Sequence, residues 1–170
     1  ARIGRPQAEG GYEMLSGHRR VRACEIAGIT EVPVVIKDLD DDTAVILLVD
    51  SNLQREHILP SEKAKAYEMK LEAMKRKAGR PAQENSAQIG SNFSGMESRE
   101  ILAEQVGESK NQISRYIRLT ELIDPLLAMV DSKDMALNAG VELSYLKTKE
   151  QAAVLEAIKS EETCPSIEQA

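Results

Sequence analysis

Residues 16–20, Ser-Gly-His-Arg-Arg, place a glycine and two arginines where a short strand should pass into a helix. The free N–H groups at the start of a helix attract anions, and a glycine lets a ligand approach the backbone. Arg19 and Arg20 add planar donors that suit phosphate oxygens. The segment is therefore a candidate phosphate site, although paired arginines also occur on ordinary solvated helix faces.

A second polar cluster, Asp-Ser-Asn-Leu-Gln-Arg-Glu over residues 50–56, closes an apolar segment. Asp50 and Asn52 carry the hard oxygen atoms that magnesium prefers, and Arg55 could bind phosphate. Considered alone, the cluster is explained just as well by the end of a helix with solvated side chains.

The segment from Glu100 to Tyr116 has the spacing of a DNA-binding helix-turn-helix. Ala103 is small where two crossing helices need a close approach, and Gly107 follows where the chain must turn sharply. Ile113 is then expected to point back into the core. An ordinary helical hairpin with a solvated face is the structural alternative.

The second helix of this motif is expected to begin at Ser109, which forms a capping-box pair with Gln112. From Ser109 to Thr120 the sequence has three basic residues and no acidic one. Side chains near the start of such a helix reach base edges, and basic residues further along hold phosphates. Beyond the cap pair, the candidate DNA contacts are Lys110, Asn111, Ser114, Arg115 and Arg118.

Two parts of the chain must position these residues, one with strands and one that is mainly helical. The strand signals all lie in residues 2–36, where short strands are predicted at Arg2–Arg5, Tyr12–Leu15 and Val32–Ile36. Between the second and third strands, His18–Ala27 is predicted to be a helix. Val21, Ala23, Cys24 and Ala27 can form one face of that helix.

The rest of the chain is predicted to be helical apart from one linker. Acidic residues and Thr43 before the apolar run Ala44–Leu53 favour a helix over a buried strand, and Pro60 suits the first turn of a longer helix. Residues 79–97 are rich in Gly, Ser, Asn and Gln and are predicted to form a flexible loop. Short helices are then expected over Ser98–Val106, Ser109–Leu122, Pro125–Val130, Asn138–Leu146 and Thr148–Lys159.

The composition limits the class of protein. With 170 residues, 42% hydrophobic and 29% charged, the chain should form one large or two small globular domains. Its apolar runs are too short to span a bilayer, and two distant cysteines indicate a reducing cytoplasm. The net charge of −6 argues against DNA binding for the chain as a whole. However, the acidic excess lies in residues 81–170, with 15 acidic and 8 basic side chains, and the helix from Ser109 is the local exception.

Three motifs in order resemble those of ParB-type partition proteins. Tyr12–Ala23 is similar to their arginine box, GERRxRA, and Ser51–Ile58 is similar to their ENLQRxxL box. The helix from Pro60 and the helix-turn-helix then follow in the order of that family, so the resemblance covers about residues 1–146.

The resemblance implies an α+β chain that is mostly helical. A small mixed-sheet domain of the ParB/sulfiredoxin type is expected over residues 1–58, and a helical DNA-binding domain over 59–170 with its helix-turn-helix at 98–121. The family's initial box and its C-terminal dimerisation domain are not evident, so we expect a fragment with an incomplete first domain. The segment at 79–97 is similar to versions found on mobile elements.

The same resemblance implies a DNA segregation protein that acts as a CTP-gated clamp. CTP and magnesium would bind to the first domain, and a homodimer would close on double-stranded DNA. A ParA-type ATPase is the implied partner, and the implied location is the cytoplasm, on a nucleoid or plasmid and away from membranes. The nucleotide would be held by Gly17, His18, Arg19, Arg20, Asn52 and Arg55, with Asn52 also helping to coordinate magnesium.

Two residues depart from the family pattern. His18 stands where the family usually has Glu, and Ser51 stands where the second box has an acidic residue linked to turnover. We therefore expect weak CTP hydrolysis at most. The alternatives are a nuclease or nucleotide hydrolase that uses the arginines and the Asp50–Asn52 cluster, and a transcriptional regulator with the same architecture. Sulfiredoxin chemistry fits poorly, because the Gly-His-Arg segment has no cysteine beside it.

Overall fold

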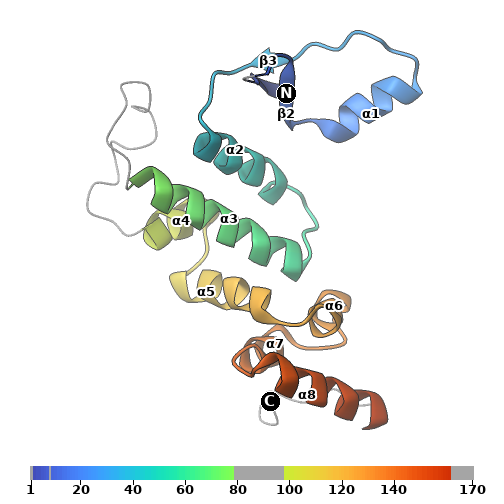
Figure 1. Ribbon diagram of the computed structural model, residues 1–170, viewed down its shortest axis with the longest axis vertical. Coiled ribbons are helices and arrows are strands. Elements are labelled where there is room, and N and C mark those ends of the chain that lie inside the picture. The colour runs from blue at the N-terminus through green and yellow to red at the C-terminus, as the bar shows by residue number, and fades with distance from the viewer. Residues whose placement is uncertain (1, 8, 79–97, 162–170) are drawn as a thin grey trace. The chain divides into compact units, whose positions relative to one another are not determined.

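The computed structural model describes residues 2–7, 9–78 and 98–161. The chain divides into two compact units, Ala1–Gln54 and Arg55–Ala170, which are coloured blue to blue-green and green to red (Figure 1).

The motifs predict a domain boundary between residues 58 and 59, and the structure divides after Gln54. The predicted loop at 79–97 lies outside the described residues. Among the helices that are described, none is long and apolar enough to cross a membrane.

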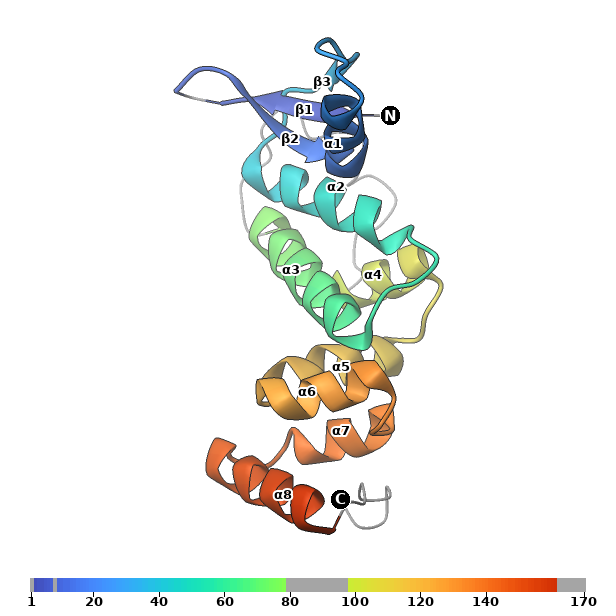
Figure 2. The same ribbon diagram turned by 90° about the vertical axis from the view of Figure 1, so that its right-hand side faces the viewer.

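The first unit contains a small mixed sheet with the strand order β2-β1-β3 (Figure 2). β1 (Ile3–Pro6) pairs antiparallel with β2 (Tyr12–Ser16) and parallel with β3 (Val35–Ile36). The third strand is shorter than predicted and does not include Val32. Pro33 explains this, because proline has no N–H to donate to a neighbouring strand.

Two helices accompany the sheet, α1 (His18–Ile26) and α2 (Asp41–Leu53). The choice of helix over strand for the apolar run is confirmed. α2 begins as the acidic residues predict, because the side chain of Asp40 accepts a hydrogen bond from the N–H of Thr43 at 2.8 Å. The buried apolar residues of this unit are Leu15, Ala44, Ile46 and Val49.

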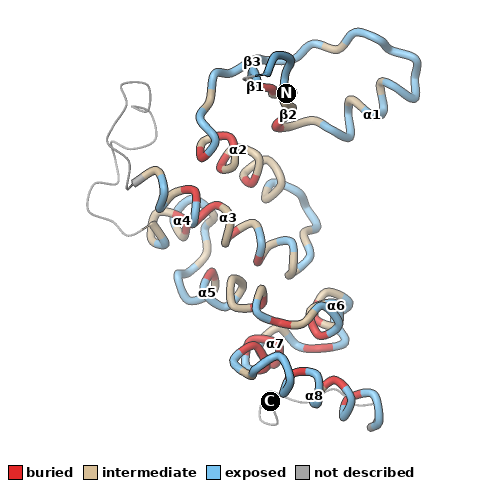
Figure 3. Tube along the Cα trace, viewed as in Figure 1, coloured by how far each residue is buried: buried red, intermediate tan, exposed pale blue. Residues whose placement is uncertain are grey.

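The apolar face predicted for α1 is not packed, and α1 has no buried residue (Figure 3). Val21 and Cys24 are half-buried, whereas Ala23 and Ala27 are exposed. The spacing of these residues is helical, but alanines carry little apolar area to drive burial. α1 therefore presents most of its surface, including its N-terminal turn, to solvent.

The second unit is entirely helical within its described residues. α3 packs against α4, α5 and α6, while α7 packs against α5 and α6. Of the helices predicted after residue 97, α4 has the predicted bounds and the others are present with shifted ends. The helices of this unit are α3 (Pro60–Ala78), α4 (Ser98–Val106), α5 (Lys110–Arg118), α6 (Asp124–Ser132), α7 (Leu137–Leu143) and α8 (Thr148–Glu161).

The helix predicted over Ser109–Leu122 is shorter in the structure. α5 ends at Arg118 and continues as a 3₁₀ turn, η1 (Leu119–Glu121). Side chains three positions apart lie on the same side of a 3₁₀ helix, and Leu119 and Leu122 are both buried. The tighter turn thus directs both leucine side chains into the core. In an α-helical continuation the two side chains would point in less similar directions.

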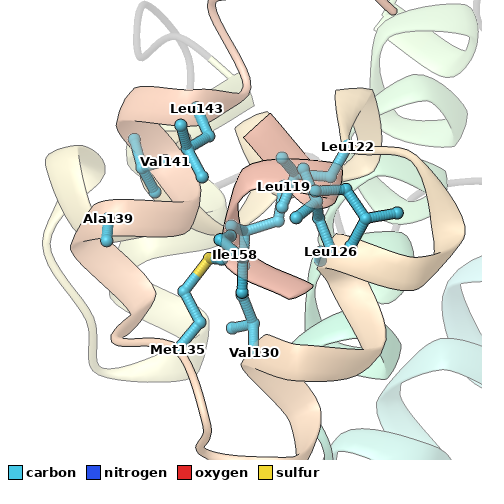
Figure 4. Close-up of a cluster of buried hydrophobic side chains, with 11 residues drawn as sticks. Leu119, Leu122, Leu126, Val130, Met135, Ala139, Val141, Leu143 and Ile158 are labelled. Carbon is cyan, nitrogen blue, oxygen red and sulfur yellow. The ribbon is translucent and has the colours of Figure 1, made fainter. Parts of the chain in front are cut away.

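A core cluster of this unit gathers side chains from α3 and from η1 through α8 (Figure 4). Gly140 in α7 lies at a close approach to α6, because a Cβ there would lie 2.8 Å from Cγ2 of Val130. Gln151 is the main polar group inside. Its amide oxygen accepts from the N–H of Ile123 at 2.9 Å, and its amide nitrogen donates to the carbonyl oxygens of Glu121 and Leu146.

Candidate nucleic-acid interface

The turn between α4 and α5 has the geometry that the sequence predicts for a helix-turn-helix. Gly107 adopts a left-handed backbone with φ of 69°, and the N–H of Glu108 donates to the carbonyl oxygen of Ala103. Leu102 and Ile113 are completely buried on the facing sides of the two helices. The prediction that Ile113 points into the core is therefore confirmed.

The predicted cap of α5 is also present. The hydroxyl of Ser109 accepts a hydrogen bond from the N–H of Gln112 at 3.1 Å. A cap of this kind fixes the point at which the helix starts and hence which side chains face outward. The capping pattern in the sequence was sufficient to locate the start of this helix.

The outward face of α5 carries most of the candidate DNA contacts. Lys110, Asn111, Ser114 and Arg115 are all exposed, and the helix has no acidic residue in its first turn. Lys110 forms an ion pair with Glu100 of α4, so its ammonium is partly neutralised. Asn111, Ser114 and Arg115 line a hollow of about 540 Å³.

Arg118 is arranged differently from the other basic residues of α5. It is half-buried, and its Nη2 donates to the carbonyl oxygen of Ser144 at 2.7 Å. Its guanidinium also stacks on the ring of Tyr145, 4.3 Å from the ring centre. The sequence could not predict this arrangement, because these partners lie 26 and 27 positions away along the chain.

A half-buried polar cluster joins α3 to the turn of the helix-turn-helix. Lys63 pairs with Glu108, and its ammonium lies 4.7 Å from the ring centre of Tyr116 and 5.7 Å from that of Tyr67. Burial, followed by the nearby charge of Glu108, raises the pKa of the Tyr67 hydroxyl well above its usual range. Tyr67 is buried, but the helical periodicity of α3 does not by itself predict this cluster. The position of Lys63 one helical turn before Tyr67 was the available signal.

The candidate phosphate segment lies at the start of α1. Gly17 has φ of 101°, and a Cβ at this position would lie 3.0 Å from Cγ and 3.3 Å from Cα of Arg2. A side chain here is therefore disfavoured by both backbone conformation and space. The side chains of His18, Arg19 and Arg20 follow directly and are exposed.

The second polar cluster forms the last turn of α2. Asn52 is half-buried, and the hydroxyl of Ser51 donates to the carbonyl oxygen of Leu48 at 2.8 Å. Arg55 is exposed and belongs to the second unit. In the part of the chain that the structure describes, no group of three or more His, Cys, Asp or Glu side chains could hold a metal ion. The protein therefore does not provide a complete metal cage from these residue types there.

Comparison with known proteins identifies two domain families along the chain. The model of the ParB N-terminal domain matches residues 3–53, and that of the ParB HTH domain matches residues 92–169. Both matches agree in order with the motifs found in the sequence.

Several curated proteins are similar over most of this chain. The probable chromosome-partitioning protein ParB of Neisseria meningitidis (serogroup A, strain Z2491) is 34% identical over 140 residues, which are 82% of this chain and 42% of that protein. The probable chromosome 1-partitioning protein ParB of Deinococcus radiodurans is 33% identical over 75% of this chain and 36% of its own length. The nucleoid occlusion protein of Listeria monocytogenes (strain HCC23) is 30% identical over 85% of this chain and 43% of its own length. The chain thus spans less than half the length of these relatives.

The fold is also similar to a solved structure. The C-terminally truncated chromosome-partitioning protein ParB from Caulobacter crescentus, in a crystal structure complexed to the centromeric parS site, has a TM-score of 0.56. It is 21% identical in sequence, and the match covers 98% of this chain and 77% of that one. The expected fold class, a small mixed sheet followed by a helix-turn-helix domain, is confirmed.

Proposed function

This chain belongs to the ParB family, and on that premise we propose that it is a sequence-specific DNA-binding partition protein that reads duplex DNA with α5. The observation that carries the proposal is a capped, acid-free helix whose inward side is fixed in the core. Its exposed residues Asn111, Ser114 and Arg115 lie together along one hollow. Such a helix can enter the major groove without any rearrangement of the unit that holds it.

The residues divide by chemistry into two roles. Lys110, Asn111 and Ser114 are assigned to base edges, because they lie in the first turns after the cap. Arg115 is assigned to a backbone phosphate, and Ser109 and Gln112 place the free N–H groups of the helix start towards the DNA. Phosphate contacts set the orientation of the protein, and base contacts select the sequence.

Selection of genomic fragments by the immobilised chain tests this proposal, with and without CTP. Enrichment of one inverted repeat is expected, and affinity for that duplex should fall steeply with added salt. An equal recovery of all fragments, or binding that does not respond to salt, would contradict sequence-specific recognition.

We propose in addition that the first unit binds CTP, with the backbone of Gly17 and the side chains of Arg19 and Arg20 at the triphosphate. Two features support this: a glycine that admits no side chain, and a helix start without an acidic residue in its first turn. His18 lies in the same turn, and Arg55 follows Asn52 in the second motif.

Magnesium fits this site only together with the nucleotide. Asn52 offers one amide oxygen, and the remaining ligands would be phosphate oxygens and water, which is the usual pattern for magnesium at triphosphates. Bound there, the ion would neutralise phosphate charge. The chain has a histidine at 18 and a serine at 51, so we propose nucleotide binding with weak hydrolysis at most.

Titration with labelled CTP tests the nucleotide site. Arg19→Ala should weaken binding at least tenfold, because a charge-assisted contact to phosphate is lost. Lys37→Ala is the control, since Lys37 is an exposed cation of the same unit that lies outside both motifs. Equal losses for both variants, or binding that is unchanged in both, would contradict the assignment.

The proposed unit of action is a homodimer, because helix-turn-helix proteins commonly read paired half-sites. Light scattering of the chain with and without the selected duplex tests this, and two chains per duplex are expected. A ParA-type ATPase is the partner proposed from family membership, and co-sedimentation with the candidate ATPase tests it.

A further inference from the structure

Arg118 connects the end of α5 to the end of α7. Its Nε donates to the hydroxyl of Ser144 at 3.1 Å, and its Nη2 donates to the carbonyl oxygen of the same residue at 2.7 Å. Ser144 is itself buried, and its hydroxyl donates to the carbonyl oxygen of Val141 at 2.6 Å. A cation that binds carbonyl groups at a helix C-terminus is favoured by the helix dipole. Two of the five N–H donors of Arg118 are therefore committed inside the unit.

Tyr145, the next residue, is held by the same guanidinium. Its ring lies under Arg118 with 4.3 Å between the guanidinium carbon and the ring centre, yet the residue is 66% exposed. Within the described residues its hydroxyl makes no hydrogen bond. A large aromatic side chain with a fixed ring and an unused hydroxyl is typical of a contact residue.

The position of Tyr145 indicates what it contacts. It lines the same hollow as Asn111, Ser114 and Arg115, the outward residues of α5. The lining includes three arginines and two glutamates, so its positive charges are in excess, which favours a polyanion. An aromatic hydroxyl is a good donor to a phosphate oxygen. A duplex that places its major groove on α5 would bring its backbone to the rim of this hollow.

We propose that the loop from Ser144 to Lys147 is a second part of the DNA-binding surface. In this proposal the hydroxyl of Tyr145 donates to a backbone phosphate, and Arg118 is the positioning residue that holds Tyr145 in place. The proposal rests on the DNA-binding function argued above. It differs from the prediction made from the sequence, in which Arg118 itself contacts the DNA.

The salt dependence of DNA binding separates a neutral donor, the hydroxyl of Tyr145, from a charged phosphate ligand. Tyr145→Phe keeps the ring and removes only the hydroxyl, so the affinity for the selected duplex should fall at least about tenfold, as for the loss of a hydrogen bond to a charged group. The slope of log affinity against log salt should not change, because a neutral donor releases no counterion. Tyr12→Phe is the matched control, since Tyr12 is 68% exposed in the other unit and should have no effect.

A double-mutant cycle tests the positioning role. Arg118→Ala should weaken binding in the wild-type background and much less in the Tyr145→Phe background, because both changes remove the same contact. Arg118→Lys should not restore affinity, since lysine keeps the charge but not the planar fork that holds Ser144. General loosening of the fold would instead weaken both backgrounds equally.

Three results would overturn the inference. The first is an affinity of Tyr145→Phe that equals that of the wild type. The second is a salt slope that becomes shallower by about one in Arg118→Ala, because this would make Arg118 a phosphate ligand. A third is full rescue by Arg118→Lys. If the wild-type chain binds no duplex at all, the proposed function fails with it. If the wild-type chain binds and Tyr145→Phe is unchanged, only the present inference fails.

Discussion

At the scale of single residues, the exposed arginine of α5 has the simplest chemistry. Arg115 lines the hollow and is exposed, so its charge is available to a phosphate. Arg115→Ala should weaken binding to all duplexes by a similar factor and make the salt slope shallower by about one. Fluorescence titrations over a series of salt concentrations measure both quantities.

A charge change elsewhere provides the comparison for Arg115. Lys159 is exposed on α8 and pairs with Glu156 at 2.9 Å. Lys159→Ala changes the net charge of the chain by the same amount as Arg115→Ala, but it should leave the slope unaltered. Equal slopes for the two variants would mean that α5 has no phosphate contact at this position.

Gly140 matters because it has no side chain, in a place where a side chain would contact its neighbours too closely. A Cβ there would lie 2.8 Å from Val130 Cγ2 and 3.3 Å from Leu119 Cδ2. Gly140→Ala gains roughly 1 kcal/mol of helix propensity, but overpacking costs about 1–3 kcal/mol. We therefore expect a net loss of up to about 2 kcal/mol in the free energy of unfolding, measured with urea.

Val130, which a Cβ at position 140 would meet, provides the control for Gly140. Val130→Ala removes the methyl groups that Gly140→Ala would meet, so the double variant should lose less stability than the sum of the single losses. Strict additivity would show that the two sites do not meet in the folded protein.

At the scale of elements, the start of α5 is fixed by one hydroxyl. Ser109→Ala removes the acceptor for the N–H of Gln112 and should cost about 1 kcal/mol of stability. Ser109→Asp keeps an acceptor at the cap, so its stability should stay close to that of the wild type. Its negative charge would face the DNA, and binding should weaken. Calorimetry and DNA titration of both variants separate capping from contact.

The junction between α3 and the helix-turn-helix should lose stability in alkali. Burial raises the pKa of Tyr67, so the folded state favours the neutral hydroxyl, and the folded protein holds its proton where the unfolded chain releases it. Its contribution is complete below the ordinary tyrosine value near about 10 and is lost as the pH rises above it. Lys63, Glu108 and Tyr116 are the other titratable groups in the cluster.

Two tyrosine variants test this pH dependence by urea unfolding between neutral and alkaline pH. Tyr67→Phe should unfold with a flatter dependence than the wild type above about pH 10. Tyr145→Phe, which removes an exposed hydroxyl, should keep the wild-type dependence. The opposite order, with the flatter curve in Tyr145→Phe, would contradict the role of Tyr67.

Most of the elements follow from local patterns, because caps and periodicity act over a few residues. The acidic start of α2, the cap at Ser109 and the turn at Gly107 were all predicted and are present. The errors occur where a distant or tertiary effect decides. α5 ends early because Leu119 and Leu122 both enter the core, and the face of α1 stays unpacked despite its helical spacing.

The candidate site was predictable in its residues but not in their contacts. The exposed positions of α5 follow from the cap and the 3.6-residue period. The inward orientation of Arg118 depends on Ser144, 26 positions later, and the pairing of Lys110 depends on the crossing of α4 and α5. Single-sequence patterns contain no information about such long-range partners.

At the scale of the whole molecule, the net charge of −6 limits how the chain finds DNA. A negative chain is repelled by a polyanion except where basic side chains are gathered, as on α5. We expect the dissociation constant for mixed-sequence duplex to be no tighter than about 10⁻⁵ M at physiological salt, at the weak end for non-specific binding. The selected duplex should bind at least about a thousandfold more tightly.

Competition between the selected duplex and mixed-sequence duplex measures this ratio directly. A ratio near one at low salt, together with tight binding to both, would show that local charge dominates and that recognition adds little. Repeating the competition at several salt concentrations separates electrostatic attraction from sequence recognition, because only the electrostatic part responds strongly to salt.

The short length of α5 has a consequence for how recognition can change over time. The helix has nine residues, with Ser109 fixing its start and the η1 turn fixing its end. Its inward side is held by Ile113, which is completely buried, while Asn111, Ser114 and Arg115 face outward. Substitution at these three outward positions leaves the packing intact. New DNA preferences can therefore arise by point mutation, without insertions and without a less stable intermediate.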